Sequence, residues 1–256
     1  MRSLTEMLES QHTYQLLQRY LPEDHSRQMT AESLALESWP DGARNVLDLG
    51  CGSGASIDTF RAIAARRGRA IEWRGVDIAD SPEVRARTRG DGVFDTFDGV
   101  TLPYADESFD VVYSDQVFEH VRHPDRLVRE VARVLKADGT FMGTVSYLEP
   151  YHSYSIFNFT PYGLVSVLRD AGFQVVALRP CVDGLTLIWR QLLFRPAFFG
   201  WFLDHASPMN LLFSVIGGMF RLNAKLRNYL KVQVTGQLCF LATRRDVDAS
   251  NGRAPI

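Results

Sequence analysis

The sequence has few cysteines, little net charge and no obvious leader segment. Its three cysteines, Cys51, Cys181 and Cys239, are widely spaced within 256 residues, which favours neither a disulfide framework nor a zinc site and fits a reducing compartment. The net charge of −2 gives no global reason to expect a nucleic-acid partner. Because residues 1–7 lack the apolar core of a secretory signal, we expect a cytoplasmic protein.

Long apolar runs and internal repeats are also missing. The longest uncharged stretch within residues 185–231, residues 206–220, contains Pro208 and is shorter than the roughly 20 residues of a membrane span. With 46% hydrophobic and 23% charged residues, the composition is that of a globular protein. The length suits one large α/β domain with an insertion or two small domains.

Apolar periodicity and turn signals predict strands that alternate with helices. Two helices are expected within residues 3–38, interrupted at Pro22. Strands are expected at 45–49, 71–76, 93–97, 109–114, 139–146, 173–179 and 233–243, and helices at 55–67, 81–88, 122–135 and 160–171. Serine or threonine before proline, at Ser81 and Thr160, marks two of the helix starts. This alternation predicts a doubly wound, parallel α/β sheet.

A glycine-rich turn follows the first expected strand, and it has the form of a nucleoside cofactor site. Glycines allow the tight turn and the close approach of a ligand. The pattern Gly50-x-Gly52-x-x-Ala55 also satisfies a dinucleotide signature, so a nicotinamide dehydrogenase is one alternative. Asp48, however, would repel a pyrophosphate and suits a cationic ligand. Asp77, at the end of the second strand, can accept hydrogen bonds from ribose hydroxyls in either cofactor type.

Further motifs lie at residues 97–104, 106–112, 119–121 and 127–139. Together with the glycine turn they resemble the class I S-adenosylmethionine-dependent methyltransferases, specifically the broad small-molecule group. The resemblance covers about residues 45–180. It implies a Rossmann-like, seven-stranded sheet, mostly parallel with an antiparallel last strand, and S-adenosyl-L-methionine as cofactor.

The resemblance also implies roles for individual residues. Glycines of the turn would approach the methionine part, Asp77 would hold the ribose, and Asp98 would accept from the adenine amino group. Ile78 would pack on the adenine, and Asp115 would lie near the sulfonium. The cofactor-binding residues expected in this way are Asp48, Gly50, Cys51, Gly52, Gly54, Asp77, Ile78, Asp98, Gly99 and Asp115. A single aspartate at a strand end is more often a cap or turn residue. Asp48, Asp77 and Asp98 lie at three successive strand ends, and together they favour a binding site.

The catalytic residues are less sharply marked. Methyl transfer is a displacement at a sulfonium-activated carbon, and a base is needed where the acceptor must lose a proton. His120, His152 and Tyr154 are the candidates, because they follow the fourth and fifth strands at the carboxyl edge of the sheet. An alternative is that His120 only packs beneath the helix at 122–135.

A metal is another possibility at the same place. Some quinone-pathway and RNA-end methyltransferases bind a divalent metal through Glu-x-x-Glu-His. Here Gln116 replaces the first glutamate before Glu119 and His120. Because an amide oxygen is a poorer ligand than a carboxylate, we expect no metal.

The expected domain division is a helical lid at 1–40, the cofactor-binding core at 41–182, an apolar helical insertion at 183–231, the last strand at 232–245 and a disordered tail at 246–256. Residues 185–231 are aromatic-rich and hold six lysines and arginines against Asp204. The insertion is either a cap over the active-site cleft or a surface that meets a membrane peripherally.

We therefore expect a methyltransferase that O-methylates a small or lipid-linked acceptor, with N- and C-methylation open. The alternatives are an S-adenosylmethionine-binding partner or scaffold without transferase activity and, third, the dehydrogenase.

Overall fold

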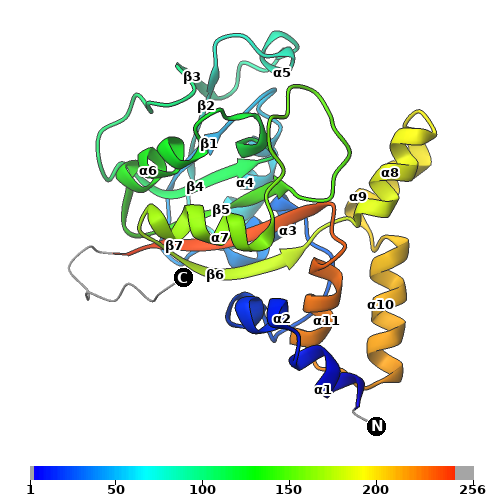
Figure 1. Ribbon diagram of the computed structural model, residues 1–256. Coiled ribbons are helices and arrows are strands. Elements are labelled where there is room, and N and C mark those ends of the chain that lie inside the picture. The colour runs from blue at the N-terminus through cyan, green and yellow to red at the C-terminus, as the bar shows by residue number, and fades with distance from the viewer. Residues whose placement is uncertain (1–2, 246–256) are drawn as a thin grey trace.

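A seven-stranded sheet forms the centre of the computed structural model, which describes residues 3–245 (Figure 1). Its strand order is β3-β2-β1-β4-β5-β7-β6. The strands are β1 (Asn45–Leu49), β2 (Glu72–Ile78), β3 (Val93–Phe97), β4 (Phe109–Asp115), β5 (Leu135–Ser146), β6 (Phe173–Pro180) and β7 (Gln237–Arg244). β7 runs antiparallel to both of its neighbours, and the β3-to-β5 part is parallel. The expected Rossmann-like sheet with an antiparallel last strand is confirmed.

Helices cover both faces of this sheet. They are α1 (Leu4–Glu9), α2 (His12–Leu17), η1 (Gln18–Tyr20), α3 (Ala31–Ser38), α4 (Ser56–Arg67), α5 (Pro82–Arg85), η2 (Phe118–His120), α6 (Pro124–Val134), α7 (Pro161–Asp170), α8 (Gly184–Leu192), η3 (Ala197–Gly200), α9 (Trp201–Asp204), α10 (Pro208–Met219) and α11 (Ala224–Val232). Side chains alternate across each strand, so Val111 belongs to the core shared with α3 and α4, and Val112 to the core shared with α6 and α7. The fold is therefore doubly wound.

The N-terminal region differs from the expectation of two helices, which was wrong. Three short α-helices and one 3₁₀ turn precede β1. α1 begins with a capping box between Ser3 and Glu6, and the Ser10 hydroxyl donates to Met7 O (2.9 Å) where the helix ends. Such local side-chain bonds compete with helix continuation. A second capping box, between Thr30 and Ser33, starts α3.

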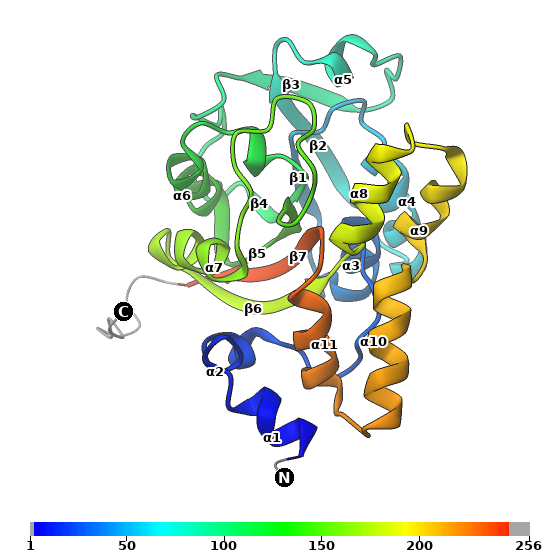
Figure 2. The ribbon, with the colours of Figure 1, turned by 45° about the vertical axis from the view of Figure 1, so that its right-hand side comes forward.

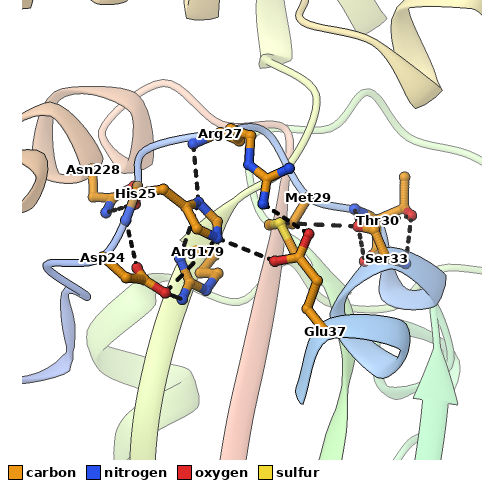
Figure 3. Close-up of polar contacts among 9 residues, drawn as sticks. All are labelled: Asp24, His25, Arg27, Met29, Thr30, Ser33, Glu37, Arg179 and Asn228. Atoms are coloured by element: carbon orange, nitrogen blue, oxygen red, sulfur yellow. Dashed lines mark hydrogen bonds and ion pairs between the residues drawn. The ribbon is translucent and has the colours of Figure 1, made fainter. Parts of the chain in front are cut away.

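The extended segment between η1 and α3 is held by a polar cluster against β6 and α11 (Figure 3). Arg179 donates to Asp24 Oδ2 (2.6 Å), and the Asn228 amide donates to the carbonyl oxygen of His25 (2.8 Å). Glu37 lies 3.1 Å from His25 Nε2 and 3.0 Å from Arg27 Nη2. α1 contacts α11, and α2 contacts α7. A lid role for the N-terminal helices stays a prediction.

Several element boundaries also shift. The expected helix at 81–88 is one turn only, although Ser81 and Thr160 do cap α5 and α7. β5 begins at Leu135 rather than 139 and carries an irregular register opposite β4, with Asp138 at a φ of 57°. β7 begins at Gln237 rather than 233. Residues 234 and 236 bond instead with residues at the start of α8: Gly184 N donates to Val234 O and Gly236 N to Val182 O (both 2.8 Å).

Two expectations concern the chain's ends and surface. The expected disordered tail, 246–256, lies outside the described residues. Within residues 3–245, every helix is too short or too polar to cross a bilayer. The helices α8, α9 and α10 lie at one side of the sheet, where α10 contacts both α8 and α11 (Figure 2).

Candidate cofactor and acceptor site

The glycine turn lies between the carboxyl ends of neighbouring strands β1 and β2. Gly50 N donates to Val76 O (2.8 Å), and this bond ties the turn to β2. Gly50 has a φ of 73°, and a Cβ added there would collide with the side chain of Val117, just after β4. Gly52 and Gly54 also have positive φ angles. The turn therefore needs glycine for its backbone shape and for its contact with Val117.

Asp77 closes the other side of the turn. Its carboxylate accepts from the backbone amides of Gly52 (2.8 Å) and Ile78 (2.7 Å). Burial raises the pKa of the Asp77 carboxyl, and these two hydrogen bonds oppose the shift. A carboxylate can accept about four hydrogen bonds, so lone pairs remain for the two hydroxyls of a ribose.

Ile78 and the turn at Asp98 lie together beyond Asp77. Asp98 Oδ1 accepts from Val100 N (2.8 Å) and Thr101 N (2.6 Å), which lowers the pKa of the Asp98 carboxyl. Gly99 has a φ of 87°, and a Cβ on it would lie 3.8 Å from Ile78 Cγ2. The Ile78 side chain is 41% exposed. An exposed aliphatic surface thus lies beside a carboxylate acceptor, and the contact of both with adenine stays a prediction.

Asp48 lies beneath the turn and is 3% exposed. It accepts a hydrogen bond from the Ser56 hydroxyl, whose oxygen accepts from Trp73 Nε1 (3.0 Å). Burial raises the pKa of the Asp48 carboxyl to about 7. Among residues 3–245 its side-chain hydrogen bond is to Ser56 at the start of α4, and its role toward a cationic ligand stays a prediction.

Arg87 covers the outside of the turn, a role that no sequence motif indicated. Its Nε donates to Gly52 O (2.8 Å), and its guanidinium lies 4.0 Å from the centroid of the Phe94 ring. Arg87 Nη2 also lies 3.5 Å from Cys51 Sγ. Burial raises the pKa of the Cys51 thiol to about 12, so this buried cysteine is held as a thiol.

The acceptor side of the site begins where β4 ends. Asp115, the last residue of β4, accepts from the Thr144 hydroxyl. Gln116 follows at a φ of 55°, a left-handed conformation that is strained for a residue with a side chain. The orientation of the Gln116 amide that satisfies its neighbours places its nitrogen 2.9 Å from Glu119 Oε1 and its oxygen 3.1 Å from Thr144 Oγ1.

Glu119 is fully buried. The sequence indicated it only as part of the motif that ends at His120. Its Oε1 also accepts from the Ser146 hydroxyl (3.0 Å), whereas its Oε2 has no hydrogen-bond partner among the described residues. Burial raises the pKa of the Glu119 carboxyl to about 8. The signal that could have identified it is its position between Gln116 and His120 at a strand end.

The two candidate histidines are brought together by the fold. The His120 and His152 rings lie 5.4 Å apart at an angle of 89°. Ligand atoms of Glu119, His120 and His152 all lie within 4.8 Å of one another. Burial lowers the pKa of His120, so this imidazole is neutral at neutral pH. The Tyr154 side chain is 75% exposed.

Large apolar side chains are exposed along α8, α9 and α10. In the insertion these are Leu185, Ile188, Trp189, Leu192, Leu193, Phe194, Phe198, Trp201, Leu211, Leu212, Val215, Met219 and Phe220. The insertion adjoins the acceptor side, because a Cβ on Gly184 would lie 2.5 Å from Leu148 O in the loop after β5. That loop exposes further apolar groups: Leu148, Tyr151, Tyr154, Ile156 and Phe157.

Residues 47–143 match the model of a methyltransferase domain family. A Mycobacterium tuberculosis protein named "Probable S-adenosylmethionine-dependent methyltransferase" is 35% identical over 147 residues, which cover 53% of this chain and 51% of that protein. A methyltransferase of Streptomyces halstedii is 34% identical over 99 residues, 37% of this chain and 34% of its own length. The chain thus spans about half the length of the first of these curated relatives and less of the second.

Solved structures show the same fold. An S-adenosylmethionine-dependent methyltransferase from Mesorhizobium loti has a TM-score of 0.52 at 19% identity and covers 84% of this chain and 98% of its own. The [4+2]-cyclase SpnF has a TM-score of 0.52 at 19% identity and covers 93% of this chain and 96% of its own. At such identities the likeness concerns the fold alone.

The fold and site define an α/β domain for a nucleoside cofactor. The comparisons narrow this class: residues 47–143 match a methyltransferase domain family, and the relatives named S-adenosylmethionine-dependent methyltransferases indicate S-adenosylmethionine as its cofactor.

Proposed function

We propose that this chain transfers a methyl group from S-adenosylmethionine to an oxygen atom of a small or lipid-linked acceptor. The observation that carries the proposal is that the glycine turn of the cofactor site lies next to the cluster of Glu119, His120 and His152. Val117 packs on Gly50 of the cofactor turn, and the Glu119–His120–His152 cluster begins two residues later. A methyl donor and a proton-handling group are thus expected on adjacent sides of one site.

The cofactor residues bind and orient the donor in this proposal. The ribose is held by Asp77, and the adenine lies between Ile78 and the Asp98 turn. A lone pair on the acceptor oxygen then forms the new O–C bond while the C–S bond breaks and its electron pair stays on sulfur. The acceptor hydroxyl must also lose its proton. In this proposal the neutral imidazole of His120 or the adjoining His152 accepts it.

The exposed apolar side chains support a lipophilic acceptor. Aromatic and aliphatic groups of α8 and of the loop after β5 adjoin through the close contact of Gly184 with Leu148. Arg190, Arg195 and Arg221 accompany them, with Asp204 as the anion of the same segment. Aromatic groups with nearby cations suit a membrane surface with anionic head groups. We include peripheral membrane contact through residues 185–231 in the proposal.

Cofactor binding and methyl transfer are tested separately. Calorimetry with S-adenosylhomocysteine should show binding, and labelled S-adenosylmethionine should label a product in a lipid or small-molecule extract. Binding without a labelled product from any fraction would instead favour a protein that binds the cofactor without transferring its methyl group. Tight NADH binding without affinity for S-adenosylhomocysteine would revive the dehydrogenase alternative.

Membrane contact has its own test. The protein should sediment with vesicles that contain anionic lipid at low salt, and less with neutral vesicles. The double substitution Phe194→Ser and Phe198→Ser should weaken binding to anionic vesicles by at least about tenfold, because both exposed rings would enter the lipid boundary. Met7→Ser, a similarly exposed site on α1, is the matched control. Absence of sedimentation at low salt would refute the membrane contact.

A further inference from the structure

We propose that Glu119, His120 and His152 bind a divalent transition-metal cation on the acceptor side of the site. The three side chains supply one carboxylate oxygen and two ring nitrogens, all within 4.8 Å of one another. A cation with ligands at about 2.1 Å requires separations of roughly 3–4 Å, so small side-chain rotations complete the site.

The backbone holds the two segments that carry these ligands in a fixed relation. Glu119 and His120 belong to η2, and His152 lies in the loop after β5. The amides of Ile156 (2.6 Å) and Phe157 (3.1 Å) both donate to Glu119 O. The loop that carries His152 is therefore fastened to the residue that supplies the carboxylate.

The unpartnered oxygen of Glu119 is the independent sign of a ligand. Oε1 is held by Ser146 and Gln116, but Oε2 is buried and has no partner among residues 3–245. A buried carboxylate oxygen without a partner costs free energy. A cation bound to Oε2 and to the two imidazoles would remove that cost and pair the charge.

Gln116 was the reason to expect no metal, and its placement removes that reason. Its amide oxygen faces Thr144, and its amide nitrogen donates to Glu119 Oε1 and to Glu149 Oε2 (3.0 Å). Gln116 is thus a positioning residue that fixes Glu119, and a third ligand is supplied by His152 instead. The sequence alone could not pair His152 with Glu119, which lies 33 positions away.

The donor set indicates the kind of cation. Mg²⁺ and Ca²⁺ prefer oxygen ligands throughout, whereas two imidazoles with one carboxylate suit Zn²⁺, Mn²⁺, Co²⁺ or Fe²⁺. Glu149 Oε1 lies 3.8 Å from His152 Nδ1 and can orient that ring from outside the ligand set. Three protein ligands leave positions open for an acceptor oxygen.

The role of the cation rests on the proposed function, although its binding does not. An acceptor hydroxyl coordinated beside the cofactor methyl would lose its proton to water at a lower pH than when free. Both imidazoles would then act as ligands and positioning groups.

The test measures the metal directly. Metal-free protein is titrated with Co²⁺, whose visible absorption reports nitrogen and carboxylate ligation, and each variant is also titrated with S-adenosylhomocysteine. We expect about one bound Co²⁺ per chain, displaced by Zn²⁺. Glu119→Gln, His120→Ala and His152→Ala should each weaken binding by at least about tenfold. His123→Ala, an exposed histidine at the start of α6, is the matched control and should bind as wild type.

The outcomes separate the two proposals. Normal S-adenosylhomocysteine binding in a variant that lost Co²⁺ supports the metal site and shows that the variant is folded. Wild-type protein that binds S-adenosylhomocysteine but not Co²⁺ overturns the metal site and leaves the proposed function intact. Co²⁺ binding that survives in all three variants also overturns it, because the cation is then held elsewhere.

Discussion

The amide of Gly52 donates to the carboxylate of Asp77 across 2.8 Å, and this bond joins the glycine turn after β1 to the end of β2. The two residues are 25 positions apart, and their strands are parallel neighbours in the sheet. One carboxylate therefore both shapes the turn and faces the place expected for the ribose. Arg87 strengthens the same corner by donating to Gly52 O.

Asp77→Ala should weaken S-adenosylhomocysteine binding by about 1–3 kcal/mol, the loss expected for charge-assisted hydrogen bonds to the ribose. Calorimetry measures the change directly. Asp80→Ala is the matched control, because Asp80 is an exposed carboxylate three residues away that pairs with Arg85. Equal affinities for wild type and Asp77→Ala would contradict the assignment of Asp77 to the cofactor.

Gly50→Ala should abolish measurable cofactor binding, because the new Cβ would collide with Val117 and the φ of 73° disfavours a side chain. Gly42→Ala separates the two causes. Its φ is 87°, but a Cβ there meets nothing within 4 Å. We expect Gly42→Ala to lose only stability, by roughly 1 kcal/mol, and to keep its affinity. Loss of affinity in both variants would mean that general destabilisation, rather than the contact of Gly50 with Val117, explains the effect.

His152→Ala should lower methyl transfer and leave S-adenosylhomocysteine affinity unchanged. The residue lies beside His120, and the hydrogen bonds of Asp77 and Asp98 described above go to other residues. If His152 handles the acceptor proton or helps to bind the cation, the loss falls on kcat and is roughly 10²–10⁴-fold. The measurement is the rate with the acceptor identified in the extract assay. A changed cofactor affinity with unchanged kcat would place His152 in the cofactor site instead.

Local sequence signals were sufficient for the sheet. The strand at 45–49, the proline-preceded caps at Ser81 and Thr160, and the glycine turn each depend on residues close together in the chain. The start of β7 was misjudged because it depends on tertiary bonds such as Gly184 N to Val234 O, and the N-terminal helices were misjudged because local caps such as that between Ser3 and Glu6 divide them.

In the candidate site, too, local motifs identified some residues and tertiary contacts were needed for the others. Asp77, Asp98 and the glycines could be proposed from motifs that lie at strand ends. Glu119 and Arg87 were missed as site residues because their importance comes from burial and from partners in other loops. The direction of the Gln116 amide, which decides between ligand and positioning residue, depends on Thr144 and Glu149. No single-sequence pattern carries that information.

The raised pKa of Asp48 links cofactor-free stability to pH. In the folded chain burial holds this pKa at about 7, compared with 3.8 for an unperturbed aspartate. Between those values the folded state binds more protons than the unfolded state, so stability falls as pH rises and the full cost is present above about pH 7.

Asp48→Asn should therefore stabilise the cofactor-free protein most at pH 8 and clearly less at pH 5, since asparagine can still accept from Ser56 but carries no charge. The difference at pH 8 should be of the order of a few kcal/mol, from about 1.4 kcal/mol per pKa unit. Urea unfolding at the two pH values measures it. Asp80→Asn, at an exposed carboxylate, is the control and should shift stability little. A stability difference between Asp48→Asn and wild type that is the same at pH 5 and pH 8 would show that the Asp48 carboxyl does not titrate in this range and would contradict the prediction.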